Sequence, residues 1–205
     1  LGSVMKKRVA ILISGRGSNM EALIKAAQND DYPAKIVLVI SNKDSATGLE
    51  IAEKYGINTK IVLRKNFTSD LDFDDHLSNI LSQLQVDIIC TAGYMKILTK
   101  KFVGEWMNKI INIHPSLLPS YKGLNTHRRA LQDGASITGC TTHIVSAELD
   151  SGPIIMQESV LIEKDDDEDT LAEKVLKLEH RIFPESLQKI ASGKLIIKDN
   201  IVLEN

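Results

Sequence analysis

The chain has 205 residues, of which 43% are hydrophobic and 25% are charged. These fractions are ordinary for a soluble globular protein, and a chain of this length can bury the core of one α/β domain without disulfide bonds. Its 25 Lys and Arg residues against 27 Asp and Glu residues leave a formal net charge of −2. The missing basic surplus argues against nucleic acid as a partner, and the lack of an apolar stretch of about 20 residues argues against a membrane.

The two cysteines, Cys90 and Cys140, each lie in an apolar run. Two cysteines make no disulfide framework, so we expect buried free thiols, which favour a reducing compartment and a cytoplasmic location. No His, Cys or Asp cluster has metal-ligand spacing, so no metal is expected. The basic start of the chain leads into an apolar run too short for a signal peptide. We expect Met5 to be the natural first residue, residues 1–4 to be foreign to the fold, and a single domain to cover residues 5–205.

In chain order, short apolar strands alternate with amphipathic helices over the first part of the sequence. Apolar runs predict strands at residues 9–13, 36–40, 59–63, 86–91 and 109–113. Helical spacing predicts helices from about residue 18, over residues 49–55 and over residues 73–84. Apolar strands joined by helices are typical of a parallel sheet covered on both faces. Residues 8–113 are therefore expected to form a doubly wound, phosphate-binding half, with ligands at the carboxyl ends of its strands.

The second part, residues 114–205, has a different pattern. Two longer strands are predicted at residues 137–145 and 154–162, joined by a turn around residues 150–153. A long helix follows from about residue 169, where Thr170 and Glu173 have the spacing of a capping box. A short hairpin is expected in the tail, at residues 194–197 and 200–203. The fold class is therefore α/β, with a doubly wound, mostly parallel sheet and a mixed C-terminal part.

A glycine-rich segment, Ser14-Gly15-Arg16-Gly17-Ser18-Asn19, joins the first strand to the first helix. Glycines let the backbone approach a ligand closely, and a helix N-terminus offers free amides to a phosphate. The segment lacks the third glycine of a dinucleotide site and the Gly-Lys-Ser/Thr of a Walker loop, so one terminal phosphate fits better than a dinucleotide. The alternative is a tight turn capped by Ser18, with Glu21 completing a capping box.

The fifth strand ends with Asn112 and His114, which alternation places on one face at the carboxyl end. An Asn amide can donate a hydrogen bond to a developing oxyanion, and a His can carry a proton near neutral pH. The alternative is a structural His beside a proline-rich turn. Asp150 has two interpretations as well. It either pairs with His114 and favours the charged imidazole, or it is simply a turn residue.

Two further polar residues are candidates for the site, namely Glu179 and His143. Glu179 lies within the apolar stripe of the long helix and therefore needs a partner. That partner is either a structural cation or an ammonium or hydroxyl group of a substrate. His143 shares a strand face with Thr141, which makes it a candidate for lining the same cleft.

Taken together, these motifs resemble the glycinamide ribonucleotide formyltransferase family, also called phosphoribosylglycinamide formyltransferase. The resemblance extends over about residues 8–193, nearly the whole chain. The matching segments are residues 14–19, 41–43, 92–98, 112–119, 150–153, 179–180 and 183–184. The run of residues 112–119 is shared by several folate-dependent formyltransferases, whereas Gly17-Ser18-Asn19 points to the glycinamide ribonucleotide branch.

The resemblance implies a formyltransferase-type Rossmann-like fold and an enzyme of de novo purine biosynthesis. Its reaction would be direct attack of the glycinamide ribonucleotide amine on the formyl carbon of 10-formyltetrahydrofolate, the co-substrate, without a metal. The partners would be these small molecules, and the chain would be a monomer or a homodimer. The resemblance implies a catalytic trio of Asn112, His114 and Asp150. It also implies ribonucleotide contacts at Gly17, Ser18, Asn19, Pro115 and Glu179, and folate contacts at Met95, Lys96, Ile97, Leu98 and Asn112.

Three positions depart from the family pattern. Asn125 stands where many members have His, and Ser151 replaces a common Gly. Asp70 stands where an Arg that meets the glutamate tail of the folate is expected, with Arg64 or Lys65 as possible substitutes.

Three alternatives to this function have their own expected signatures. A methionyl-tRNA formyltransferase should carry an additional RNA-binding domain and a basic surface. A folate deformylase should carry a regulatory domain before the core. A nucleotide-binding module without catalysis would explain the glycine-rich segment, but it would leave Asn112, His114 and Asp150 without a purpose.

Overall fold

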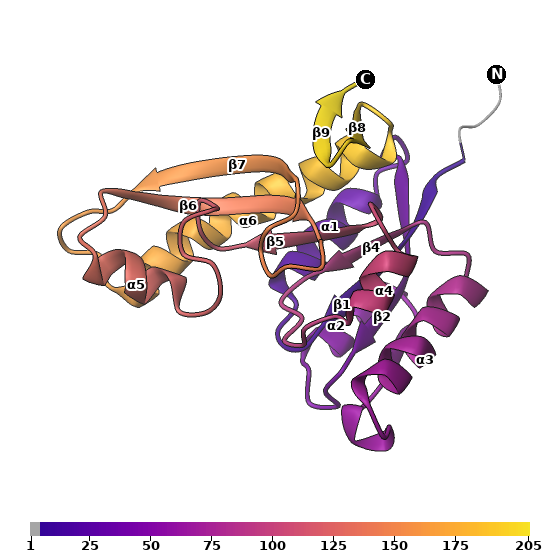
Figure 1. The fold of residues 1–205 in the computed structure, drawn as a ribbon. Coiled ribbons are helices and arrows are strands. Elements are labelled where there is room, and N and C mark those ends of the chain that lie inside the picture. Colours follow the sequence, from indigo (N-terminus) through magenta and orange to yellow (C-terminus); the bar gives the residue numbers. More distant parts are fainter. Residues whose placement is uncertain (1–4) are drawn as a thin grey trace.

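The computed structural model of the chain describes residues 5–205, so the expectation for residues 1–4 lies outside the described residues. The main sheet has seven strands in the order β3-β2-β1-β4-β5-β6-β7 (Figure 1). The strands are β1 (Lys7–Ile13), β2 (Ala34–Ser41), β3 (Thr59–Ile61), β4 (Ile88–Thr91), β5 (Ile110–His114), β6 (Ile137–Ile144) and β7 (Ile154–Leu161). Strands β1 to β5 pair in parallel, whereas β6 is antiparallel to both of its neighbours. The predicted mostly parallel α/β sheet is confirmed.

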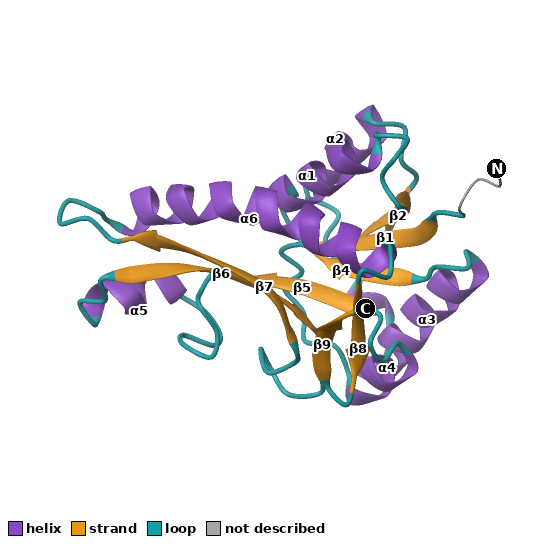
Figure 2. Cartoon of the chain, turned by 90° about the horizontal axis from the view of Figure 1, so that it is seen from above, coloured by secondary structure: helices purple, strands orange, loops and turns teal. Residues whose placement is uncertain are grey.

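Helices cover both faces of the parallel part, because its strands are apolar on both sides (Figure 2). Alternate residues of β1 show this: Ile11 belongs to one buried cluster and Leu12 to the other. The helices are α1 (Ser18–Ala27), α2 (Gly48–Lys54), α3 (Asp70–Gln83), α4 (Lys100–Glu105), α5 (Thr126–Gln132) and α6 (Glu168–Ala191). Residues of α1, α2 and α6 pack in the first cluster, and residues of α3 and α4 in the second.

The strand order reverses between β1 and β4, since β1 pairs with β2 on one side and with β4 on the other. At such a reversal the connecting loops diverge to opposite faces and leave a crevice at the carboxyl ends of the strands. The loops after β1, β4 and β5, which carry Gly17, the segment of Met95 to Leu98, and Pro115, all begin at this edge of the sheet. The fold thus brings them to one place.

Strands β6 and β7 extend the sheet, and α6 runs along them back to the C-terminal hairpin (Figure 1). That hairpin consists of β8 (Leu195–Lys198) and β9 (Ile201–Glu204), as predicted. Asp199 and Asn200 form its turn with positive φ values of 52° and 62°, a backbone conformation that Asp and Asn tolerate better than most residues. No helix within residues 5–205 combines the length and apolar character that crossing a membrane requires.

Several local predictions were wrong. Helix α1 is capped by Gly17, whose φ of 70° suits a residue without Cβ, and no side chain caps it, so the Ser18–Glu21 capping box considered as the alternative to phosphate binding is absent. Helix α6 does begin with a capping box, but Asp167 and Thr170 form it instead of Thr170 and Glu173. Helices α4 and α5 were not predicted, and the third strand ends two residues earlier than expected.

Candidate functional site

A cavity of about 670 Å³ opens at the carboxyl ends of β4 and β5. Its walls come from the ends of these strands, the loop after β4, the loop before α5, the end of β6 with the loop after it, and single residues of α1, α4, α5 and α6. Gly17 and Ser18 are not part of its lining. The predicted site residues that line it are Asn19, Met95, Lys96, Ile97, Leu98, Asn112, His114, Pro115, His143, Asp150 and Glu179.

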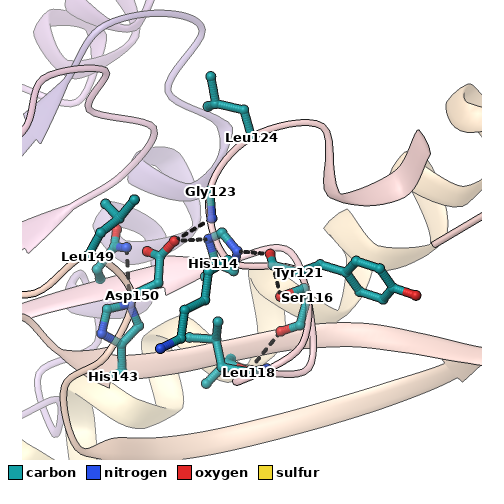
Figure 3. Close-up of polar contacts among 12 residues, drawn as sticks. His114, Ser116, Leu118, Tyr121, Gly123, Leu124, His143, Leu149 and Asp150 are labelled. Carbon is teal, nitrogen blue, oxygen red and sulfur yellow. Dashed lines mark hydrogen bonds and ion pairs between the residues drawn. The ribbon is translucent and has the colours of Figure 1, made fainter. Parts of the chain in front are cut away.

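His114 and Asp150 meet in this cavity, as one of the two sequence interpretations required. The Nδ1 atom of His114 lies 3.6 Å from Oδ2 of Asp150, and both side chains are buried. The other ring nitrogen, Nε2, lies 2.8 Å from the backbone oxygen of Tyr121. Figure 3 shows the imidazole between these two oxygens. Because a carbonyl oxygen only accepts hydrogen bonds, Nε2 carries a proton, and Nδ1 faces a carboxylate.

Asp150 is held in place by a backbone group that sequence reasoning missed. Its Oδ2 accepts a hydrogen bond of 2.8 Å from the backbone N–H of Gly123 (Figure 3). Its own backbone is left-handed, with φ at 50°, a conformation that Asp tolerates better than most residues. Asp150 is therefore a turn residue by its backbone and a neighbour of His114 by its side chain.

The loop between β5 and α5 is fixed by polar side chains of the antiparallel strands. The Thr141 hydroxyl donates to the backbone oxygen of Ser116 at 2.7 Å and accepts from the backbone N–H of Leu118 at 3.1 Å. Gln157 donates to the backbone oxygen of Leu118 at 2.8 Å. These contacts fix the chain that presents the Tyr121 oxygen to His114. Thr141 shares a register position with His114, so only the observed strand pairing reveals this role.

Asn112 faces two side chains. The Thr91 hydroxyl donates to Oδ1 of Asn112 at 2.7 Å, and Nδ2 of Asn112 lies 3.2 Å from Nε2 of His143. His143 is 2% exposed, and burial lowers its pKa below the usual value, opposed by its hydrogen bond to the Ile144 backbone oxygen. His143 is among the residues that line the cavity.

The glycine-rich loop touches two other loops through Ser14, which sequence reasoning gave no role. Its hydroxyl donates to Oδ1 of Asn42 at 2.6 Å and accepts from the backbone N–H of Met95 at 2.7 Å. The loop also packs against the start of α2, where the backbone N–H of Gly48 donates to the Gly15 oxygen at 3.0 Å. A Cβ atom on Gly48 would lie only 3.1 Å from that oxygen.

Asn19 and Glu179 form a polar pair at one end of the cavity. Asn19 donates from Nδ2 to Oε1 of Glu179 at 3.0 Å, and the Oδ1 atom of Asn19 is buried without a partner among the described residues. Burial raises the pKa of Glu179 to about 7, against the opposing effect of the Asn19 hydrogen bond. The partner observed for this inward-facing carboxyl within residues 5–205 is therefore an amide, and not the structural cation that was one of the two expected partners.

The segment after β4 presents apolar side chains to the cavity. Ile97 is 76% exposed and Met95 is also exposed. Lys96 instead lies against α3, with Nζ 3.7 Å from Asp74 and 3.5 Å from Asp70. The two apolar side chains make a surface suited to a flat, largely apolar ligand.

The three departures from the family pattern have local structural explanations. Arg64 forms an ion pair of 2.7 Å with Asp70 and lowers the pKa of that carboxyl. The side chain that was expected to stand in for the missing Arg is therefore bound to Asp70 itself. Asn125 precedes α5 with φ at 54°, a conformation that Asn adopts more readily than most residues. Ser151 accepts a hydrogen bond from Lys122. Within residues 5–205, no three His, Cys, Asp or Glu side chains gather as a metal site would require.

Comparisons with known proteins agree on one family. The formyl transferase family matches residues 7–187. The chain is 46% identical over 195 residues to the trifunctional purine biosynthetic protein adenosine-3 of Homo sapiens, a match that covers 95% of this chain and 19% of that protein. The chain thus spans about a fifth of that relative. It is 44% identical to the phosphoribosylglycinamide formyltransferase of Haemophilus influenzae, over 95% of this chain and 92% of that protein.

A solved structure supports the same relationship. The crystal structure of phosphoribosylglycinamide formyltransferase from Anaplasma phagocytophilum matches with a TM-score of 0.90 at 46% identity, covering 98% of this chain and 95% of that one. Both the sequence and the fold therefore agree over nearly the whole length. The chain belongs to the formyl transferase family, and within it to the group of the phosphoribosylglycinamide formyltransferases.

Proposed function

We propose that the chain transfers the formyl group of 10-formyltetrahydrofolate to the primary amine of glycinamide ribonucleotide. The observation that carries the proposal is the meeting of the His114–Asp150 pair with the Asn112 amide in one cavity. A formyl transfer between two nitrogens needs a donor for an oxyanion and a carrier for one proton, and these side chains supply both. The relatives named above support the choice of substrates.

The proposed reaction is a nucleophilic addition followed by an elimination. The amine lone pair attacks the formyl carbon, the new C–N bond forms, and the carbonyl oxygen becomes negative. Asn112 donates a hydrogen bond to that oxygen, and an imidazolium at His114 stabilises the same charge. The His114 imidazolium gives one proton to the folate nitrogen N10, and the resulting neutral ring then accepts one proton from the new ammonium, so that one proton passes from the amine to N10 in total. The bond between N10 and the formyl carbon then breaks, and the products are formylated ribonucleotide and tetrahydrofolate.

The folate is proposed to occupy the cavity itself, and the ribonucleotide is proposed to reach into it from the start of α1, where Asn19 lies in the cavity lining. The ribonucleotide phosphate lies at Gly17, Ser18 and Asn19, where α1 begins, with the ribose beside Pro115 and the glycinamide part at Glu179. Helix α1 favours this arrangement, because its first amides and its partial positive charge face an anion. The pteridine of the folate lies against the segment of Met95 to Leu98, whose exposed side chains are apolar. No metal takes part in the proposed step.

The proposal is tested by assaying the purified chain with both substrates. Tetrahydrofolate release is followed by absorbance, and the formylated product by mass spectrometry. We expect turnover that requires both substrates and that disappears when glycinamide without the ribose phosphate replaces the ribonucleotide. A folded chain that leaves both substrates unchanged would refute the proposal. Turnover with methionyl-tRNA in place of the ribonucleotide would instead support the first alternative considered above.

A further inference from the structure

His143 lies beside the reacting groups but has no role in the proposed reaction. It stands directly opposite Asn112 in the ladder between β5 and β6. Its ring is almost fully buried, and its Nε2 atom is 3.2 Å from Nδ2 of Asn112. A buried imidazole in contact with the proposed oxyanion donor affects the orientation of the Asn112 side-chain amide, because each donor of the amide must face an acceptor.

The direction of each hydrogen bond around Asn112 follows from its neighbours. Nδ1 of His143 lies 3.0 Å from the backbone oxygen of Ile144, which only accepts, so Nδ1 carries the proton. In the neutral ring, Nε2 is then an acceptor and faces the amide nitrogen of Asn112. The Thr91 hydroxyl contacts Oδ1 of Asn112 at 2.7 Å but the Ile111 oxygen only at 3.5 Å, so it donates to Asn112.

We infer that neutral His143 is a positioning residue that orients the side-chain amide of Asn112. Its Nε2 lone pair accepts one N–H of the amide, and the Thr91 hydroxyl holds the amide oxygen on the other side. The second N–H of the amide remains available to an oxyanion in the cavity. This inference rests on the proposed function, in which Asn112 stabilises that oxyanion.

Protonation of His143 turns its Nε2 atom from a hydrogen-bond acceptor into a donor. Both ring nitrogens then donate, so an N–H of the ring faces the N–H of Asn112, and the amide must turn or move away. Burial opposes this protonation, and the positive form of His114 opposes it as well. The hydrogen bond to Ile144 and the Asp150 carboxylate favour it. Glu179 of α6 lines the same cavity. The net direction is a pKa below that of a free His, so the amide is held correctly at neutral pH and released in acid.

The first test measures the tautomer of His143 and needs no turnover. A long-range ¹H–¹⁵N spectrum of the whole chain labelled with ¹⁵N-histidine reports which ring nitrogen holds the proton, and the signals of His143 are those that vanish in His143→Gln. At neutral pH we expect a neutral ring with the proton on Nδ1. A proton on Nε2, or on both nitrogens, would overturn the inference. This readout is independent of whether the proposed substrates are correct.

The second test uses three variants and the assay described above. His143→Gln keeps an acceptor oxygen near the position of Nε2 but cannot titrate. His143→Leu has a similar volume and no acceptor. His76→Gln, on the exposed side of α3, is the matched control. We expect kcat to fall on the order of tenfold to a hundredfold in His143→Leu, approaching the effect of a lost oxyanion donor, with both KM values within a few-fold of wild type. His143→Gln should recover most of the loss.

The pH profile separates positioning from a merely structural role. In the wild type, kcat should fall in acid as His143 becomes protonated, and this part of the fall should be missing in His143→Gln. Equal losses in the Gln and Leu variants, or an unchanged acid limb in the Gln variant, would contradict the inference. If His143→Leu does not fold, the acid part of the kcat profile of His143→Gln and the tautomer measurement still test the inference.

Discussion

At the scale of single residues, the proposed chemistry depends most on the charge of Asp150. Asp150→Asn keeps the shape and an oxygen that can accept the Gly123 N–H, but it removes the negative charge beside His114. Steady-state kinetics should show kcat reduced on the order of a hundredfold or more, with small changes in both KM values, because the charged imidazole loses its stabilisation. Asp75→Asn, which removes an exposed carboxylate from α3, is the control and should leave kcat unchanged. Normal turnover of Asp150→Asn would return that residue to a turn role only.

Glu179 combines a cost in stability with a proposed role in binding. Its folded pKa of about 7 lies above the usual value of 4.5, so the folded state holds the proton more tightly than the unfolded state. The sign follows from linkage: the free energy of unfolding decreases as pH rises from about 4.5 to about 7, because the buried carboxyl must ionise. The loss is on the order of 3 kcal/mol at most.

The variant Glu179→Gln therefore makes a paired prediction. At pH 8 urea unfolding should show the variant to be more stable than wild type by about 1–3 kcal/mol, and at pH 5 the two should be similar. The same variant should raise the KM for the ribonucleotide, because the proposed contact to the glycinamide part loses its charge. A variant with the same pH dependence of stability as wild type would show that Glu179 does not control it.

At the scale of elements, the conformation of the glycine-rich segment depends on the start of α2. A Cβ on Gly48 would lie 2.6 Å from a methyl group of Ile13, 3.1 Å from the Gly15 oxygen and 3.3 Å from the Gly17 Cα. The methyl group can move, but the backbone of the loop must shift. Gly48→Ala should therefore raise the KM for the ribonucleotide severalfold and leave the KM for the folate nearly unchanged.

Gly104→Ala, in α4, is the matched control, because a Cβ there meets nothing within 4 Å. Helix propensity makes this change slightly stabilising, and both KM values should stay at the wild-type level. Equal effects of the two Ala substitutions on the ribonucleotide KM would contradict the role given to Gly48.

The sequence predicts elements well where the hydrophobic pattern is strong. The central strands of the parallel part have apolar cores, such as Val9 to Ile13 in β1, and the apolar stripe of α6 is long, so both were found. Helix α4 has six residues and α5 has seven, mostly polar, which is too short for a clear period. Gly17 caps α1 through its backbone conformation, which no side-chain pattern reveals.

The residues of the site, like the elements, divide into those that the sequence pattern reveals and those that it does not. Side chains with distinctive chemistry, such as Asn112 and His114, stand out in the sequence. The backbone oxygen of Tyr121 and the backbone N–H of Gly123, which hold the His–Asp pair, have no signature, because any residue offers them. Thr91 reaches Asn112 only because β4 and β5 pair in a particular register, and register is a property of the folded sheet.

At the scale of the whole molecule, α6 connects the two parts of the chain. Its Phe183 is fully buried in a cluster that also contains Ile11 of β1 and Ile144 of β6. We propose on this basis that residues 5–205 unfold as one domain. Phe183→Ala should lower the free energy of unfolding by about 3–5 kcal/mol, the usual cost of emptying such a site. The only tryptophan, Trp106, packs in the other cluster and reports on it by fluorescence.

The measurement is urea unfolding followed by Trp106 fluorescence and by far-ultraviolet circular dichroism. In both wild type and Phe183→Ala the two signals should change together, and the midpoint of both should move by the same amount. A fluorescence transition that stays in place while the circular dichroism transition moves would mean that the parts unfold separately. The single-domain proposal would then be wrong.

Ser14 belongs to the glycine-rich segment proposed to hold the ribonucleotide phosphate, and its hydroxyl accepts a hydrogen bond from the backbone N–H of Met95, in the segment proposed for the folate. Ordering either loop therefore changes the free energy needed to order its neighbour, and the two ligands become thermodynamically linked. Around a closed cycle of binding steps, the factor by which the ribonucleotide tightens the folate must equal the factor by which the folate tightens the ribonucleotide. The coupling free energy is therefore a property of the two ligands together and does not depend on which of them binds first. Calorimetric titrations performed in both orders should yield the same number.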